Sequence, residues 1–258
     1  MRSSSTNAKT EVVIVASAFG VDAIRRDGHS VWAEKAALSG ADGFEVRREL
    51  CADVSLHALA QLGERIHAAG LWAVHSTPAT LFAADGSLDR DALALAIDEA
   101  HALGARIVKL QLGGDEHGVA TDSATLDALT RAVGGSRARV LVENGQLRAG
   151  GLPSAFKMLF AALPAETGLA MTFDTGNWRW ADVNPLDAAE RLASHVGYVH
   201  CKTTQGKGAR RFAVAPAPDD AAFAALLARL PSDVPRGIEY PFHDEADAAI
   251  QVARIAVF

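Results

Sequence analysis

The chain of 258 residues is 49% hydrophobic, 22% charged and 6% aromatic, a composition that excludes an intrinsically disordered protein. Its net charge of −6, from 25 basic and 31 acidic residues, argues against a protein that works by neutralising nucleic acid or anionic membranes. No uninterrupted apolar stretch reaches the roughly 18 residues of a membrane span. Cys51 and Cys201 form no paired motif, which is typical of free thiols in a reducing compartment. We therefore expect a cytoplasmic protein whose partners include neither nucleic acid nor a membrane.

Short β-branched runs alternate along the chain with longer segments rich in alanine and leucine. The short runs are continuously apolar, as in parallel strands that are covered on both faces. The expected strands are 12–16, 43–47, 71–75, 106–112, 139–143, 169–174, 197–201 and 237–240. Eight strands, each followed by a helix, predict an α/β fold of the (β/α)8 TIM-barrel type.

Residues that typically begin or end a helix stand between these runs. Ser30, Asn184 and Asp244 stand where side chains can cap a helix start, and a proline follows Asn184 directly. Gly104 follows an alanine- and leucine-rich segment as a helix stop.

We find no linker or composition shift that would divide the chain. We expect residues 1–258 to form a single TIM-barrel domain, with residues 1–10 as a disordered N-terminal tail. The richest irregular stretch, 203–220, follows the seventh strand, and its Gly, Pro and Arg content suits an ordered loop over a site.

Polar side chains gather at the ends of the expected strands, where a barrel places its chemistry. The pairs that alternation puts on one face are Glu45 with Arg47, Lys109 with Gln111, and His200 with Lys202. Ionisable groups that point into a barrel are costly unless they are paired or bind a metal, so this accumulation is not a packing pattern.

Four polar residues stand at equivalent places at the ends of consecutive expected strands: Glu143, Asp174, His200 and Glu239. Neighbouring parallel strands are about 4.8 Å apart, so four inward groups at one height can surround one ion. Three carboxylates and an imidazole suit Mn²⁺, Mg²⁺ or Co²⁺ and, less exclusively, Zn²⁺; we expect one divalent ion, with Mn²⁺ first. The alternative is a metal-free polar network with Arg47, Lys109 or Lys202.

A resemblance to a known family rests on five segments: ADGFEVR, VLVEN, FDTGNW, VHCK and IEY. Over essentially its whole length the chain resembles the xylose-isomerase-like TIM-barrel superfamily, which includes sugar and sugar-phosphate isomerases and epimerases, inosose isomerases and dehydratases, and relatives of endonuclease IV. The resemblance implies that Glu143, Asp174, His200 and Glu239 hold one divalent ion. The ketose 3-epimerases imply that Glu143 and Glu239 also form the acid/base pair. The family further implies a homodimer or homotetramer.

Two positions depart from the family pattern. Asn177 stands where many relatives have the His of a DxxH motif, and Thr203 stands where many have the Asp of HxKD. An endonuclease cluster needs further His and Asp ligands that the chain lacks, so a DNA-repair nuclease is disfavoured.

Such a site predicts proton transfer beside a carbonyl group. We expect an isomerase or epimerase that acts on a small sugar, keto-sugar or sugar acid through a metal-stabilised enediolate. A lyase (dehydratase, keto-sugar eliminase or keto-acid decarboxylase) on the same barrel is the alternative, followed by a non-catalytic metabolite binder. Arg47, Lys109 and Lys202 fit either an anionic substrate or charge balance for the carboxylates, and Lys109 is a candidate donor to the developing enediolate oxygen.

Further strand-end and loop residues are candidate contacts to a small polyhydroxylated substrate. These are Glu45, Arg47, His75, Gln111, Asn144, Asn177, Trp178, Lys202 and Arg210. Trp178 fits a pocket wall or a packing role equally well, and the charges of the loop that contains Arg210 fit either a phosphate site or a solvated surface.

Overall fold

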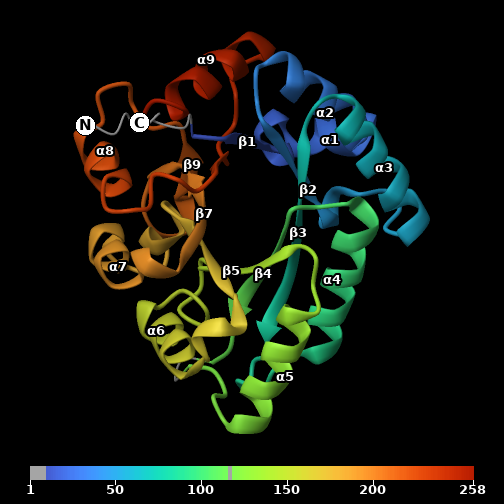
Figure 1. The fold of residues 1–258 in the computed structure, drawn as a ribbon. Coiled ribbons are helices and arrows are strands. Elements are labelled where there is room, and N and C mark those ends of the chain that lie inside the picture. The colour runs from blue at the N-terminus through green and yellow to red at the C-terminus, as the bar shows by residue number, and fades with distance from the viewer. Residues whose placement is uncertain (1–9, 116–117) are drawn as a thin grey trace, which may run out of the picture.

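The computed structural model describes residues 10–115 and 118–258. Its centre is a closed barrel of eight parallel strands, each paired with its neighbours around the ring (Figure 1). The strands are β1 (Val12–Val15), β2 (Gly43–Arg47), β3 (Trp72–Phe82), β4 (Ile107–Gly113), β5 (Arg139–Glu143), β6 (Ala170–Asp174), β7 (Val196–Cys201) and β10 (Arg236–Ile238). The predicted TIM barrel is confirmed. The tail expected at residues 1–10 lies, apart from Thr10, outside the described residues.

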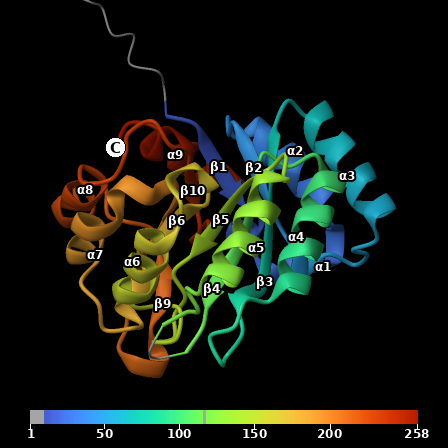
Figure 2. The ribbon, with the colours of Figure 1, turned by 60° about the horizontal axis from the view of Figure 1, so that its bottom comes forward.

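Helices surround the barrel, and Figure 2 shows them standing along the outside of the strands. They are α1 (Val21–Asp27), α2 (His29–Leu38), α3 (Leu56–Ala68), α4 (Arg90–Leu103), α5 (Ser123–Gly134), α6 (Pro153–Ala162), α7 (Pro185–Leu192), α8 (Ala221–Leu227) and α9 (Glu245–Ile255). No helix among the described residues is both long and apolar enough to cross a membrane.

Most of the predicted helix ends are where the sequence placed them. The side chain of Asn184 accepts a hydrogen bond from the backbone of Leu186, and Asp244 caps α9 in the same way. Gly104 ends α4 in the left-handed conformation. The cap at Ser30 is wrong, because α2 already begins at His29, after a glycine whose positive φ separates it from α1.

The stretch 203–220 is more regular than the expected loop. It begins with a two-stranded antiparallel ribbon of β8 (Thr203–Gln205) and β9 (Phe212–Val214) that lies outside the barrel. Gly206 permits the tight turn, since its φ is +84° and an added Cβ would lie 2.2 Å from the Arg210 carbonyl oxygen.

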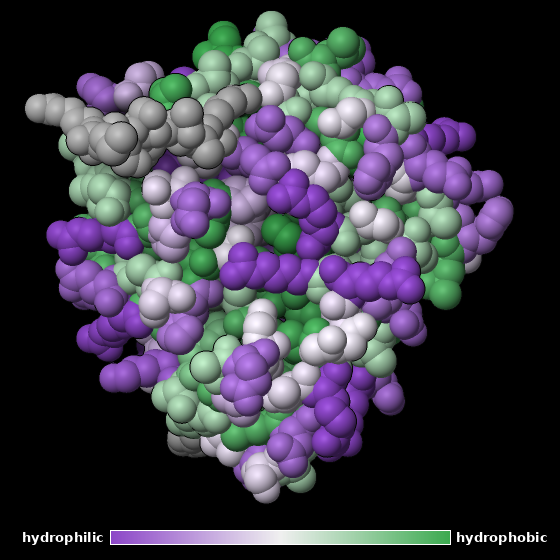
Figure 3. Space-filling model, in the orientation of Figure 1, coloured by the Kyte–Doolittle hydropathy of each residue, from purple (hydrophilic) through white to green (hydrophobic). Residues whose placement is uncertain are grey.

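The interior of the barrel has an apolar layer at the end where the strands begin. This layer consists of Val13, Trp72, Val74, Ile107, Leu141, Ala170 and Tyr198. Below it, Arg106 stacks on the Trp72 ring and pairs with Glu11. Figure 3 looks onto this end and shows hydrophilic side chains gathered across its middle. The layer separates this end from the carboxyl ends of the strands, where the interior becomes polar.

Candidate functional site

The four predicted metal ligands come together at the carboxyl ends of β5, β6, β7 and β10. Glu143 and Asp174 are the last residues of their strands, His200 lies next to last in β7, and Glu239 directly follows β10. Parallel register places Asp174 beside His200. One potential ligand atom from each of the four residues lies within 4.8 Å of those of the other three.

The centre of this cluster is Nδ1 of His200. It lies 2.9 Å from Glu143 Oε1, 3.1 Å from Glu239 Oε2 and 3.9 Å from Asp174 Oδ2. The side chains of three residues are buried, and that of Glu239 is 14% exposed. Three carboxylates therefore face one imidazole nitrogen at the mouth of the barrel.

Glu45 holds the other nitrogen of the imidazole. His200 Nε2 lies 2.7 Å from Glu45 Oε2, and the Tyr198 hydroxyl donates to the same oxygen at 3.0 Å. If Nε2 carries the proton that bonds Glu45, Nδ1 is left with its lone pair toward the cluster, which is the arrangement of metal-binding histidines. Glu45, predicted to contact substrate, is fully buried beneath His200.

The loop after β6 orients Asp174. The backbone N–H groups of Gly176 and Asn177 both donate to Asp174 Oδ1 at 2.8 Å, so Oδ2 is directed at the cluster. The side-chain amide of Asn144 bonds to the backbone of Asp174: its Oδ1 accepts from the Asp174 N–H, and its Nδ2 donates to the Asp174 carbonyl oxygen. The Asn177 amide nitrogen donates to the Asn144 carbonyl, and its oxygen accepts from Gln146. Both asparagines thus hold the strand ends together.

Three cations surround the carboxylates. Lys109 Nζ lies 2.7 Å from Glu143 Oε2 and 3.6 Å from Glu45 Oε1. Arg47 pairs with Glu239 Oε1 at 2.8 Å and also with Glu49. A third cation, Lys202, contacts Asp174 and Glu239. These pairs compensate the negative charge that burial would otherwise make costly.

The buried charges shift one another's pKa values in opposite directions. Burial raises the pKa of Asp174 to about 7, with further increase from Glu239 and Glu143 and opposition from Lys202. Burial also acts against ionisation of Glu45, but His200 and Lys109 outweigh it and lower its pKa to about 2. Although burial disfavours a charged imidazole, Glu45, Glu239 and Glu143 hold the pKa of His200 well above its usual value. The carboxylates therefore stabilise a positive charge at Nδ1, which either a proton or a metal ion can supply.

The donor set fits a divalent metal ion. Glu143 Oε1 and Asp174 Oδ2 are buried, and neither accepts a hydrogen bond of regular geometry. His200 Nδ1 lies near the first oxygen and Lys202 Nζ near the second. Both oxygens therefore have lone pairs that could bind an ion. Oxygen-rich sites with one imidazole suit hard to borderline ions such as Mn²⁺.

A cavity of about 250 Å³ opens above the cluster. The described residues of its lining are all polar: Arg47, Gln111, Glu143, Gln146, Asn177, Lys202 and Glu239. Gln111 also donates to Glu143 Oε2 at 2.5 Å. Gln146 was missed in the sequence, where only its position two residues beyond VLVEN, in the loop after β5, pointed to it. The buried Lys109 is not part of this lining, but it forms an ion pair with Glu143, which is.

Five predicted contacts are not part of the cavity lining. Glu45 lies buried beneath His200, and Asn144 is buried and bonded to Asp174. The other three lie further away. His75 is in register with Val46 and Val108, on the face of β3 that turns to the helices, and it bonds Glu99 of α4 at 3.0 Å. Trp178 is fully buried and packs against Phe156 and Phe173. Arg210 is exposed in the turn between β8 and β9.

Comparison with known proteins shows the fold. No protein-family model and no curated protein sequence matches the chain. A D-allulose 3-epimerase from Methylomonas sp. superposes with a TM-score of 0.66 at 15% sequence identity, over 96% of each chain. A xylose isomerase domain containing protein from Salmonella typhimurium LT2 gives 0.65 at 17% identity, over 95% of each chain. This protein has the xylose isomerase-like barrel fold.

A probable 3-DHS dehydratase from Bacillus anthracis shares this fold too. It superposes with a TM-score of 0.64 at 11% identity, over 95% of this chain and 98% of that one. The xylose isomerase-like barrel thus occurs in proteins named as epimerases and in one named as a dehydratase. The activity depends on the side chains at the barrel mouth.

Proposed function

We propose that this protein is a divalent-metal-dependent isomerase or epimerase that moves a proton beside a carbonyl group of a small polyhydroxylated substrate. The observation that carries the proposal is the pair Glu143 and Glu239. Both carboxylates line the same cavity, and they approach His200 Nδ1 from different strands at 2.9 and 3.1 Å. This arrangement supplies a base and an acid to one small molecule.

The proposed ion, the two glutamates and Lys109 would have different roles in this reaction. A divalent ion bound by Glu143, Asp174, His200 and Glu239 would polarise a substrate carbonyl and acidify the adjacent C–H bond. One glutamate, in its ionised form, would remove the carbon-bound proton, and the other, in its protonated form, would give a proton to the opposite face or to the neighbouring carbon, so that the two exchange protonation states. Lys109 acts through Glu143, because its ammonium group favours the ionised carboxylate and lowers the pKa of Glu143.

The cavity suggests the kind of substrate. The residues that the structure describes in its lining all carry hydrogen-bonding groups, and a volume of about 250 Å³ is below the range of drug-sized pockets. A compound of a few carbons with several hydroxyl groups fits such a lining. The similar Methylomonas enzyme is described in complex with D-allulose, a molecule of this class.

A lyase is the second candidate, since the similar structure from Bacillus anthracis is named as a probable dehydratase. The same proton removal followed by loss of a β-hydroxyl group gives dehydration. Mn²⁺ is our proposed ion, and we expect a cytoplasmic homodimer or homotetramer.

Exchange with solvent deuterium tests the reaction class. Incubating the Mn²⁺-loaded protein in D₂O with a panel of ketoses, keto-acids and inososes should place deuterium on one substrate carbon, as seen by NMR. An isomerase or epimerase does so without loss of water or CO₂, whereas a lyase releases one of them. Glu143→Gln and Glu239→Gln should each abolish exchange, while Glu64→Gln on the exposed face of α3 should not change it. Exchange that persists in both site variants would remove the acid/base assignment.

A further inference from the structure

The ammonium group of Lys202 lies in contact with two of the four residues that we propose as metal ligands. Its Nζ is 2.7 Å from Asp174 Oδ2 and 2.7 Å from Glu239 Oε2. These are the same two oxygens that lie 3.9 and 3.1 Å from His200 Nδ1. A cation is therefore already present at the oxygens that a divalent ion would use.

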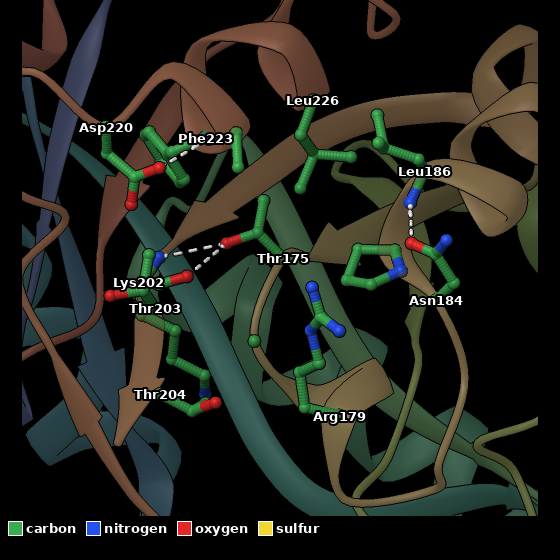
Figure 4. A pocket seen from close by; sticks show the side chains of 13 residues that line it. Thr175, Arg179, Asn184, Leu186, Lys202, Thr203, Thr204, Asp220, Phe223 and Leu226 are labelled. Carbon is green, nitrogen blue, oxygen red and sulfur yellow. Dashed lines mark hydrogen bonds between the residues drawn. The ribbon is translucent and has the colours of Figure 1, made fainter.

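The lysine is held in this place by its backbone and its stem. Thr175 Oγ1 donates to the Lys202 carbonyl at 2.7 Å and accepts from the Lys202 N–H at 3.0 Å, as Figure 4 shows. Gly176 lies against the stem so closely that an added Cβ would be 2.7 Å from Lys202 Cγ. With its side chain 5% exposed, the lysine has little access to water that could replace its two carboxylate partners.

Lys202 also separates two cavities. One is the polar cavity above the cluster; the other, of about 250 Å³, lies between α7, α8 and the β8–β9 ribbon (Figure 4). Thr204, Arg179 and Leu226 belong to the lining of this second cavity. Lys202 therefore belongs to the lining of both cavities.

We propose that Lys202 is a built-in competitor of the metal ion, which neutralises Asp174 and Glu239 when no ion is bound and lowers the affinity of the site for divalent ions. The reason is electrostatic. An ammonium group and a divalent ion that share two carboxylates a few ångströms apart repel each other strongly in a site that excludes water. Metal binding therefore requires the ammonium group to move or to tolerate that repulsion. The inference rests on the metal site of the proposed function.

The test compares metal affinity and apo-protein stability in charge-removing and charge-keeping variants. Lys202→Met and Lys202→Gln remove the ammonium group, Lys202→Arg keeps a positive charge, and Lys207→Met alters an exposed lysine of the neighbouring ribbon as control. Circular dichroism first establishes which variants fold. Mn²⁺ is then titrated calorimetrically into protein treated with EDTA, and thermal unfolding of the apo forms is recorded.

We expect Lys202→Met or Lys202→Gln to bind Mn²⁺ at least 10-fold more tightly than the wild type and to unfold at a lower temperature without metal. Lys202→Arg and Lys207→Met should resemble the wild type in affinity. Unchanged or weaker binding in the neutral variants, with tight binding in the wild type, overturns the competitor role and leaves the proposed function intact. Binding only after loss of the lysine charge supports the competitor and contradicts metal dependence of the wild type. An absence of binding in every protein contradicts both.

Discussion

Among single residues, His200 is central to the site, and its two ring nitrogens have different surroundings. Nδ1 faces three carboxylates that meet at the barrel mouth, and Nε2 bonds to Glu45 deeper in the barrel. Glu45 is fully buried, accepts a hydrogen bond from Tyr198 and lies 3.6 Å from Lys109 Nζ, and it is not part of the cavity lining. We assign it the task of fixing the orientation and tautomer of the imidazole.

Removing the charge of Glu45 should therefore weaken metal binding without touching a metal ligand. We expect Glu45→Gln to reduce Mn²⁺ affinity by about 10- to 100-fold, because a histidine loses basicity and orientation when its carboxylate partner is removed. Tyr198→Phe, which leaves the carboxylate in place, should have a smaller effect. Calorimetric titration of the folded variants measures both. An affinity of Glu45→Gln equal to that of the wild type would show that the imidazole orients itself without this carboxylate.

A second buried charge network lies on the outer face of β3. Glu99 of α4 accepts hydrogen bonds from Arg48 and lies 3.0 Å from His75 Nε2, and its side chain is 2% exposed. Burial alone would raise its pKa, but these two partners outweigh burial and lower it from 4.5 to about 2. The network ties the residue after Arg47 to a helix, and so supports the strand end that carries the guanidinium of the site.

This network gives a pH dependence whose sign follows from the lowered pKa. Folding favours the ionised form of Glu99, so its stabilisation is complete above pH 4.5 and is lost as the pH falls toward about 2. Glu99→Gln should lower the free energy of unfolding most at neutral pH and progressively less below pH 4.5. Urea unfolding of both proteins from about pH 7 down to about pH 3 measures the difference. A gap that stays constant over this range would mean that folding leaves the pKa of Glu99 unchanged.

At the scale of elements, α3 and α4 pack so closely that one position admits no side chain. Gly63 lies in the middle of α3, and an added Cβ would be 2.1 Å from the Leu103 carbonyl oxygen at the end of α4. A glycine inside a helix ordinarily lowers helix stability, so only this contact explains its presence.

Two matched substitutions separate helix propensity from packing. Gly63→Ala should lower the free energy of unfolding by about 1–3 kcal/mol, because the backbone of α4 has to move away. Gly134→Ala, at the last position of α5, meets nothing within 4 Å and should raise stability by about 0.4–1 kcal/mol. Urea denaturation followed by circular dichroism gives both values. Equal effects of the same sign at the two positions would contradict the packing explanation.

At the scale of the whole molecule, the acidic net charge does not describe the site. The chain carries −6, yet Arg47, Lys109 and Lys202 all lie among the carboxylates at the barrel mouth. The proposed metal ion would bind only to the folded state, since its four proposed ligands come from four different strand ends. The ion should therefore stabilise the barrel as a whole.

Thermal unfolding with and without metal measures this coupling. Mn²⁺ at 100 times its Kd should stabilise the protein by about 2.7 kcal/mol, which corresponds to a rise of about 5–10 °C in Tm for a chain of this size. EDTA should reverse the rise, and Asp174→Asn should reduce it because one ligand is lost. A rise of the same size in Asp174→Asn would place the binding elsewhere.

Local patterns were enough to predict the barrel and the four-residue cluster. Most strands contain a short apolar run, and alternation and strand ends indicate which polar residues point inward, as at Glu143 and Asp174. The same reasoning did not place His75 or Trp178. The sequence placed both at strand ends, but His75 lies within β3 and faces the helices, and Trp178 follows β6 in a short helix and turns into the core. Such directions depend on a single residue of register and on the path of a loop.

Strand periodicity and residue type are local properties, and they were enough to predict the fold class and the residues of the cluster. What each polar group contacts depends on the tertiary structure. It placed Glu45 behind His200, Lys202 between Asp174 and Glu239, and Gln146 at the cavity. These contacts join residues that are far apart in the chain and in different strands. Their distances depend on barrel closure and strand register, which no single segment encodes.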